Sequence, residues 1–183
     1  MSATKYLLLK DIGLSVKSEF LDLFGRKTAR RVVLGKLLEL RAQRYAAGHP
    51  QIAAVKEALA LSYLTWTMAE LEQSDALAID AIASLKAANV KGRYEFRIAN
   101  MLQVRSRVAQ RLHRPRVALE LAEDALASYN RSRMISWQRA RLMESLIQLH
   151  RVVGDPERAR RLVSELQVLR TVLNSRSARH RYL

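Results

Sequence analysis

A short segment recurs three times along this chain at nearly even spacing. The segment Gly154–Ala159 resembles His113–Ala118 and, more faintly, Gln73–Ala78, so that successive segments begin about 40 residues apart. A fixed period of this length is typical of stacked helix-turn-helix units rather than of a single catalytic domain. The sequence therefore predicts a helical-repeat scaffold, and such scaffolds work by presenting a surface to another molecule.

Composition limits the alternatives to this architecture. The 183 residues are 49% apolar and 27% charged, which suits one ordered solenoid with a sizeable core. Because the chain has no cysteine, disulfides, thiolate metal sites and cysteine nucleophiles are excluded, and we expect a cytoplasmic protein. The apolar run Tyr6–Leu9 ends at Lys10, too soon for a signal peptide or a membrane span, so we expect neither export nor membrane insertion.

Basic residues are concentrated in the second half of the chain. The net charge is +15, and from residue 91 onward the basic residues are 19 arginines and the single lysine Lys91. The planar guanidinium group binds carboxylates and phosphates in a fork-like geometry, so this bias favours an acidic partner. An alternative stays open at this point, in which a GC-rich genome favours arginine codons and the arginines only solvate helix faces.

Prolines and glycines mark where helices begin and end. Pro50, Pro115 and Pro156 each suit the first position of a helix, Asp155 suits an N-cap, and Gly154 suits a left-handed C-cap. The apolar spacing between these marks indicates three antiparallel hairpins. The predicted helices span 50–72, 74–89, 93–112, 115–130, 135–152 and 156–174.

The first predicted hairpin needs a further helix to cover it. The run Ala58–Ala69, which includes Trp66, is apolar nearly all round, as in a helix that is covered on several sides. A helix over 27–47 is expected to pack on it as an N-terminal cap. The predicted divisions are an N-terminal segment with the capping helix (1–47), the helical repeats (48–174) and a basic flexible tail (175–183).

Small residues recur in the second helix of each predicted hairpin. The positions are Ala118, Ala122, Ala125 and Leu126, then Ala159, Val163 and Leu166, and Ala78, Ile82 and Leu85. This pattern resembles the tetratricopeptide-repeat (TPR) family, although the spacing exceeds the family's period of about 34 residues and the first helices lack its Leu-Gly and Tyr positions. The resemblance implies an all-α, TPR-like solenoid whose concave groove, lined by the first helix of each hairpin, holds peptides or partner proteins.

Polar residues on two of these first helices are the candidate partner-binding residues. Arginines and amides gather on one face of the helix predicted over 93–112, and a similar face follows on 135–152. Trp137 could stack on a peptide side chain or a base, or could be buried against the neighbouring hairpin. The candidate site consists of Arg93, Arg97, Asn100, Arg107, Arg111, Arg133, Trp137, Arg141 and Arg151.

Catalytic patterns are missing from the sequence. The histidines His49, His113, His150 and His180 are far apart and form no helical pair with zinc-binding spacing. No glycine-rich phosphate loop or nucleophile elbow is present. We therefore expect no enzymatic activity, no cofactor and no metal ion.

Three functions remain open from the sequence. The favoured one is a protein-interaction scaffold or adaptor that binds an acidic peptide or protein through the arginine-rich groove. The second is an RNA- or DNA-binding subunit of a nucleoprotein complex. The third is a ligand-sensing repeat domain of a transcriptional regulator, although no DNA-reading helix-turn-helix is evident.

An amphipathic patch near the N-terminus has its own set of partners. It comprises Val16, Phe20, Leu21, Leu23 and Phe24. The patch could dock on the chain's own scaffold, on a second chain to form a homo-oligomer, or on another protein. Docking on its own scaffold is the expectation.

Overall fold

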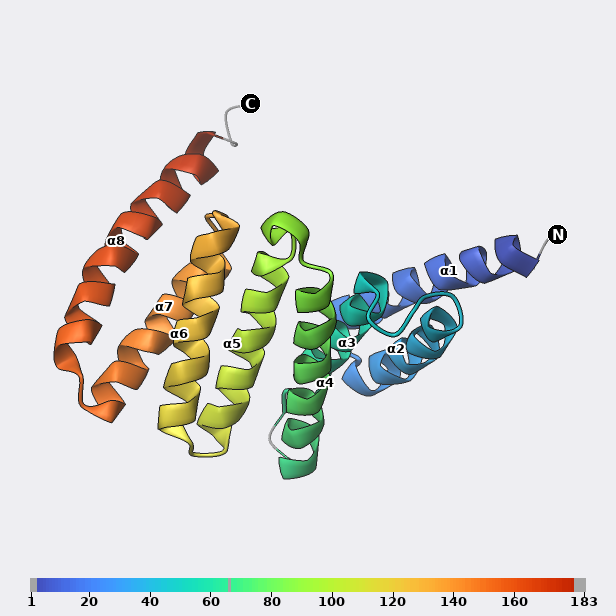
Figure 1. Cartoon of the computed structure of the whole chain (residues 1–183), viewed down its shortest axis with the longest axis horizontal. Coiled ribbons are helices and arrows are strands. Elements are labelled where there is room, and N and C mark those ends of the chain that lie inside the picture. Colours follow the sequence, from blue (N-terminus) through green and yellow to red (C-terminus); the bar gives the residue numbers. More distant parts are fainter. Residues whose placement is uncertain (1–2, 66, 180–183) are drawn as a thin grey trace. The chain divides into compact units, whose positions relative to one another are not determined.

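The computed structural model describes residues 3–65 and 67–179. All regular secondary structure in these ranges is helical (Figure 1). The α-helices are α1 (Ala3–Leu23), α2 (Lys27–Ala42), α3 (Pro50–Tyr63), α4 (Met68–Ala87), α5 (Glu95–Arg111), α6 (Pro115–Ser132), α7 (Trp137–Val153) and α8 (Pro156–Arg179), with a 3-10 turn η1 (Val90–Gly92) before α5. The prediction of an all-α helical-repeat fold is confirmed. The chain forms two compact units, Met1–Ala88 and Asn89–Leu183.

The predicted helix starts and stops hold at most hairpins. Pro50, Pro115 and Pro156 are the first residues of α3, α6 and α8. Asp155 accepts a hydrogen bond of 3.0 Å from the backbone N–H of Arg158, as expected of an N-cap. Gly154 ends α7 with φ of 94°, a left-handed conformation that glycine adopts without steric cost.

The predicted helix over 50–72 is wrong, because α3 ends at Tyr63 and the next helix, α4, begins at Met68. Thr67 begins α4 as its N-cap and donates from its hydroxyl to Glu70 at 2.8 Å. Arg31 of α2 donates to the carbonyl of Ser62 at 2.6 Å, which holds the end of α3. The local bond at Thr67 and the long-range bond from Arg31 together prevail over apolar periodicity. The segment Gln73–Ala78 therefore lies inside α4 and marks no turn, and Trp66 lies outside the described residues.

The bonds at this break predict a pH dependence of stability. Hydrogen bonds from Thr65 and Thr67, and then from Arg31, lower the pKa of Glu70 from 4.5 to about 2. Because the pKa is depressed in the folded state, the stabilisation is complete above pH 4.5 and is lost as the pH falls towards 2. We expect Glu70→Gln to weaken the loss of thermal stability across this range, whereas Glu72→Gln, at an exposed neighbouring site, should leave it unchanged. If both variants lost thermal stability to the same extent as the pH falls through this range, the pH dependence could not be assigned to Glu70.

Residues 3–42 form a hairpin that precedes the first predicted one. Consecutive helices pack in chain order, α1 on α2, α2 on α3 and α3 on α4. Leu34 and Leu37 of α2 meet Val55 and Leu59 of α3 in one buried cluster. The prediction that a helix in this region caps α3 is confirmed, and α1 adds a second N-terminal helix. Leu61 and Met68 are nevertheless exposed, so the run Ala58–Ala69 is not covered all round as predicted.

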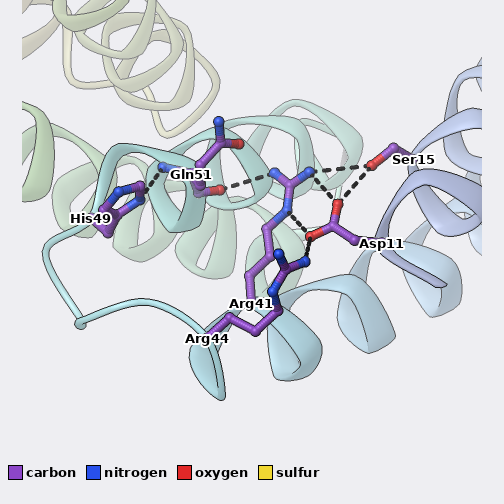
Figure 2. Close-up of polar contacts among 6 residues, drawn as sticks. All are labelled: Asp11, Ser15, Arg41, Arg44, His49 and Gln51. Carbon is purple, nitrogen blue, oxygen red and sulfur yellow. Dashed lines mark hydrogen bonds and ion pairs between the residues drawn. The ribbon is translucent and has the colours of Figure 1, made fainter. Parts of the chain in front are cut away.

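A buried ion cluster fixes α1 on α2 and α3 (Figure 2). Asp11 of α1 accepts hydrogen bonds of 3.1 and 2.9 Å from the guanidinium of Arg41 on α2, and Arg44 lies at 3.4 Å. Arg41 also donates to the carbonyl of Gln51 on α3 at 3.1 Å and to the hydroxyl of Ser15 at 3.2 Å. A single arginine therefore links three helices.

The N-terminal apolar patch does not dock on its own scaffold. Leu21 is buried, but Val16, Phe20, Leu23 and Phe24 are all exposed. The expectation of self-docking is wrong for these four residues, because Asp11 sits on the inner face of α1 and its bonds to Arg41 turn the patch outward. Apolar spacing along α1 carries no signal of this ion pair.

In the second unit α5, α6, α7 and α8 pack consecutively, and Figure 1 shows them side by side. Ala118, Ala122 and Ala125 of α6 are fully buried, as the predicted small-residue seam requires. Ala118 and Ala159 each lie one turn into their helices, whereas Ala78 lies ten residues after the start of α4. Ala78 is buried, but its alignment with Ala118 is wrong because α4 begins earlier than predicted.

The seam predicts a cost for a larger side chain at Ala118. Its Cβ has no exposed surface, and its carbonyl accepts a hydrogen bond of 2.8 Å from the hydroxyl of Ser106 on α5. Ala118→Leu should therefore lower the free energy of unfolding by about 1 to 3 kcal/mol, measured by urea denaturation. Ala127→Leu, at an exposed position on the same helix, is the matched control. Equal stability of the two variants would refute close packing at Ala118.

The C-terminal helix α8 continues to Arg179, beyond the end at 174 that the sequence predicts. The predicted tail over 175–183 is therefore helical as far as Arg179, and its last residues, 180–183, lie outside the described residues. No glycine or proline follows Pro156 in the sequence to mark an earlier end of this helix.

Candidate partner-binding site

Two first helices of the hairpins, α5 and α7, carry the predicted site. α5 is covered over most of its surface, and its buried residues include Gln103, one of the amides on the expected polar stripe. Arg107 is the most exposed of the candidate residues that lie within α5, while Arg97, Asn100 and Arg111 are partly buried. The stripe is therefore not one open face.

Three guanidinium groups gather where α5 and α7 come together. Partial burial, followed by the positive charges of Arg111 and Arg141, lowers the pKa of Arg107 below its ordinary value. Arg111 belongs to the last turn of α5, and Arg141 lies on the exposed face of α7. We call Arg107, Arg111 and Arg141 the arginine cluster. The concentration of positive charge suits a carboxylate or phosphate group.

Tyr129 of α6 lies behind this cluster. Its ring is fully buried and meets Phe96 edge to face, with ring centroids 5.6 Å apart. Its hydroxyl donates to the side-chain oxygen of Asn100, so this candidate amide is engaged inside the fold. Burial raises the pKa of Tyr129 to about 12, and the nearby charge of Arg107 acts in the opposite direction. Tyr129 carries no motif that would have identified it from sequence.

A pocket continues the cluster along the same two helices. The side-chain amide of Gln110 on α5 donates to the hydroxyl of Ser145 on α7 at 3.1 Å. Beyond this bond lies a pocket of about 370 Å³ with both amide and apolar walls. Its lining residues are Gln110, His113, Pro115, Gln148, Leu149 and Val152. Sequence reasoning missed this pocket because Gln110 and His113 show no periodic signal of their own.

The remaining candidates lie beside the cluster or apart from it. Trp137 is the first residue of α7, is 46% exposed, and precedes Arg141 by one helical turn. Arg133, grouped with the face of the helix predicted over 135–152, is the left-handed C-cap of α6, and α7 begins four residues later. Arg93 and Arg97 lie 5.6 Å from the ring centre of Tyr94. Arg151 is exposed near the end of α7.

No metal-binding group stands out in the described part of the chain, where no three His, Asp or Glu side chains converge. His49 accepts a capping hydrogen bond from Gln51 at 3.2 Å, and His113 lines the pocket. His150 is buried between Glu123 at 3.4 Å and Asp155 at 3.6 Å, while His180 is not among the described residues. Across these same ranges, no helix has the length and apolarity needed to cross a membrane.

Comparison with family models and with curated proteins found no match. Solved structures do match. The chain superposes over 88% of its length on 63% of the chain in the crystal structure of BtubC (BKLC) from P. vanneervenii, with a TM-score of 0.76 and 16% identity. It therefore spans less than two thirds of that protein.

A second similar structure contains nearly identical TPR-like repeats from Podosopora anserina, in a protein described as a kinesin light chain. The match covers 93% of this chain and 78% of that one, with a TM-score of 0.70 and 14% identity. A single-residue variant of the same protein matches with the same TM-score, over 77% of its chain. The chain is, in its fold, a TPR-like helical-repeat protein.

Proposed function

We propose that this chain is a non-enzymatic protein-interaction module that binds an acidic peptide or protein segment through the arginine cluster. The supporting observation is the grouping of Arg107, Arg111 and Arg141 on two neighbouring first helices. The charges that act most on Arg107 are two further guanidinium groups. A carboxylate bound among them relieves this repulsion and gains charge-assisted hydrogen bonds.

The pocket beside the cluster favours a peptide as the ligand. Leu149 and Val152 offer an apolar wall, and Gln110 and Gln148 offer amides that can bind a peptide backbone. Trp137 lies one turn from Arg141 on the other side and can cover an apolar side chain. The proposed ligand is therefore an acidic segment with an apolar residue next to a carboxylate. The proposed place of binding is the cytoplasm.

The test uses a fluorescent peptide of alternating glutamate and leucine residues and a double charge reversal. Arg107→Glu with Arg141→Glu should weaken binding of this probe by about 10- to 100-fold, since hydrogen bonds to charged groups contribute about 1.5 to 3 kcal/mol. The control is Arg116→Glu with Arg161→Glu, which makes the same change in net charge at exposed sites on α6 and α8. An equal loss in both double variants would reject the cluster as the site.

Nucleic acid is the second candidate, supported by the net charge of +15. Salt dependence separates the two ligands. Binding of single- or double-stranded nucleic acid should weaken with a log-log slope of about −0.7 to −0.9 per phosphate contact, whereas a peptide anchored in an apolar pocket should respond less. Stronger binding of an RNA oligonucleotide than of the acidic peptide, with this steep slope, would replace the first proposal by the second.

A further inference from the structure

Helix α1 carries apolar residues on two faces, one packed on the fold through Leu14 and Leu21 and one turned to solvent. Asp11, Ser18 and Leu21 lie on the buried face against α2. On the opposite face every large apolar side chain is between 52% and 84% exposed. We call this the outer face of α1, and it consists of Leu9, Ile12, Val16, Phe20, Leu23 and Phe24.

The rotation of α1 is fixed by the buried ion cluster (Figure 2). Asp11 is held by two hydrogen bonds from Arg41, and Arg41 is itself bonded to the carbonyl of Gln51 on α3. A turn of α1 that buried the outer face would pull Asp11 away from its partners and leave Arg41 unpaired. A buried charge without a partner is costly, so a single chain keeps the outer face in water.

The outer face is large for a surface without a partner. From Leu9 to Phe24 it runs about 23 Å along the helix at 1.5 Å per residue. The rings of Phe20 and Phe24 lie together at one end, with centroids 4.6 Å apart. Together these six side chains expose several hundred Å² of apolar surface. This area is at the upper limit for an apolar patch on a typical monomer. It approaches the roughly 800 Å² of surface that each partner buries in a standard protein interface.

Charge at the edges of the outer face favours a second chain over a charged partner. Lys10 and Lys17 lie along one edge, and Glu19 and Asp22 along the other, so these four residues sum to no net charge. Asp22 is also paired with Arg30 of α2 at 2.5 Å. Two molecules that each carry +15 repel one another over most of their surface. The outer face of α1 is a place where they can meet without that repulsion.

We propose that two chains pair through the outer faces of α1, with the two helices parallel. Leu9, Val16 and Leu23 are spaced seven residues apart, as in the seam of a coiled coil. A Cβ at Gly13 would meet no atom within 4 Å, so the partner helix can approach closely there. About a two-fold axis, parallel helices bring the lysine edge of one chain against the Glu19 edge of the other, whereas antiparallel helices bring lysines together.

The first test compares two valines that differ only in their surroundings. Val16→Glu places a carboxylate in the proposed seam, and Val168→Glu places one on α8. The two sites are similarly exposed, since Val16 is 61% and Val168 is 66% exposed. In sedimentation equilibrium over a dilution series, the unchanged chain and Val168→Glu should be dimers. Val16→Glu should raise the dimer dissociation constant by about 30-fold or more while keeping its far-ultraviolet circular dichroism.

The second test reads the direction of the helices and relies on the absence of cysteine from the chain. Leu9→Cys and Leu23→Cys, each alone, should form disulfide-linked dimers on mild oxidation, because equivalent residues face each other in a parallel pair. Val168→Cys should stay unlinked. Linkage only when the Leu9→Cys and Leu23→Cys chains are mixed would overturn the parallel arrangement. An unchanged chain that stays monomeric throughout the dilution series would overturn the pairing itself.

Discussion

Tyr129→Ala is expected to lower the free energy of unfolding by about 3 to 5 kcal/mol, the usual cost of removing a fully buried aromatic side chain. The ring has no exposed surface and packs against Phe96 of α5. Ala122 and Ala125 on the same helix are also fully buried, and a closely packed interior of this kind closes a cavity only in part. Urea denaturation followed by circular dichroism measures the loss.

Tyr129→Phe separates the ring from its hydroxyl. This variant keeps the packing and removes only the hydrogen bond to Asn100, so its cost should be about 1 kcal/mol. A loss of less than about 1 kcal/mol in Tyr129→Ala would show that the ring is not a packed core residue. Tyr129→Phe also bears on the candidate site. Its affinity for the fluorescent glutamate-leucine peptide should be nearly unchanged, because Arg107 and Arg141 are intact.

Prolines and glycines predict helix ends correctly where the residue itself determines the local backbone geometry. Pro115, Pro156 and Gly154 restrict or release φ regardless of their neighbours, so the ends that they predict were confirmed. The break between α3 and α4 depends instead on Arg31, more than 30 residues earlier in the chain, which bonds to the carbonyl of Ser62 and to Glu70. A local pattern contains no information on such a distant partner.

The candidate site was predictable in composition but not in its arrangement. Helical spacing placed Arg107 and Arg111 on one side of α5, and partial burial with neighbouring positive charge agrees with their grouping. Gln103 lies on the same side of the helix by this spacing, yet it is buried. Periodicity along one helix gives the direction of each side chain, but neighbouring helices decide which directions are covered. The pocket at Gln110 depends on two helices together and was therefore missed.

Arg41→Met is expected to destabilise the first unit by about 3 kcal/mol, because it leaves Asp11 buried with only the more distant Arg44 as a charged partner. It also removes the bond to the carbonyl of Gln51 that joins α2 to α3. Both side chains of the pair are largely shielded from water, at 13% and 11% exposure, so the effect should exceed that of a surface ion pair. Lys56→Met, which breaks the pair with the exposed Asp80, is the control.

Adding Asp11→Leu to Arg41→Met should recover most of this stability, since well-packed apolar residues often replace a buried ion pair at little or no cost. The recovery would not restore the bonds that set the rotation of α1. In the double variant the helix is free to turn Val16 and Phe20 towards α2, because no ion pair then fixes its rotation. We therefore expect a chain with near-normal unfolding free energy but weaker self-association than the unchanged protein, measured by urea denaturation and sedimentation equilibrium on the same sample. Full stability together with unchanged self-association would contradict the role of Asp11 in directing the outer face to solvent.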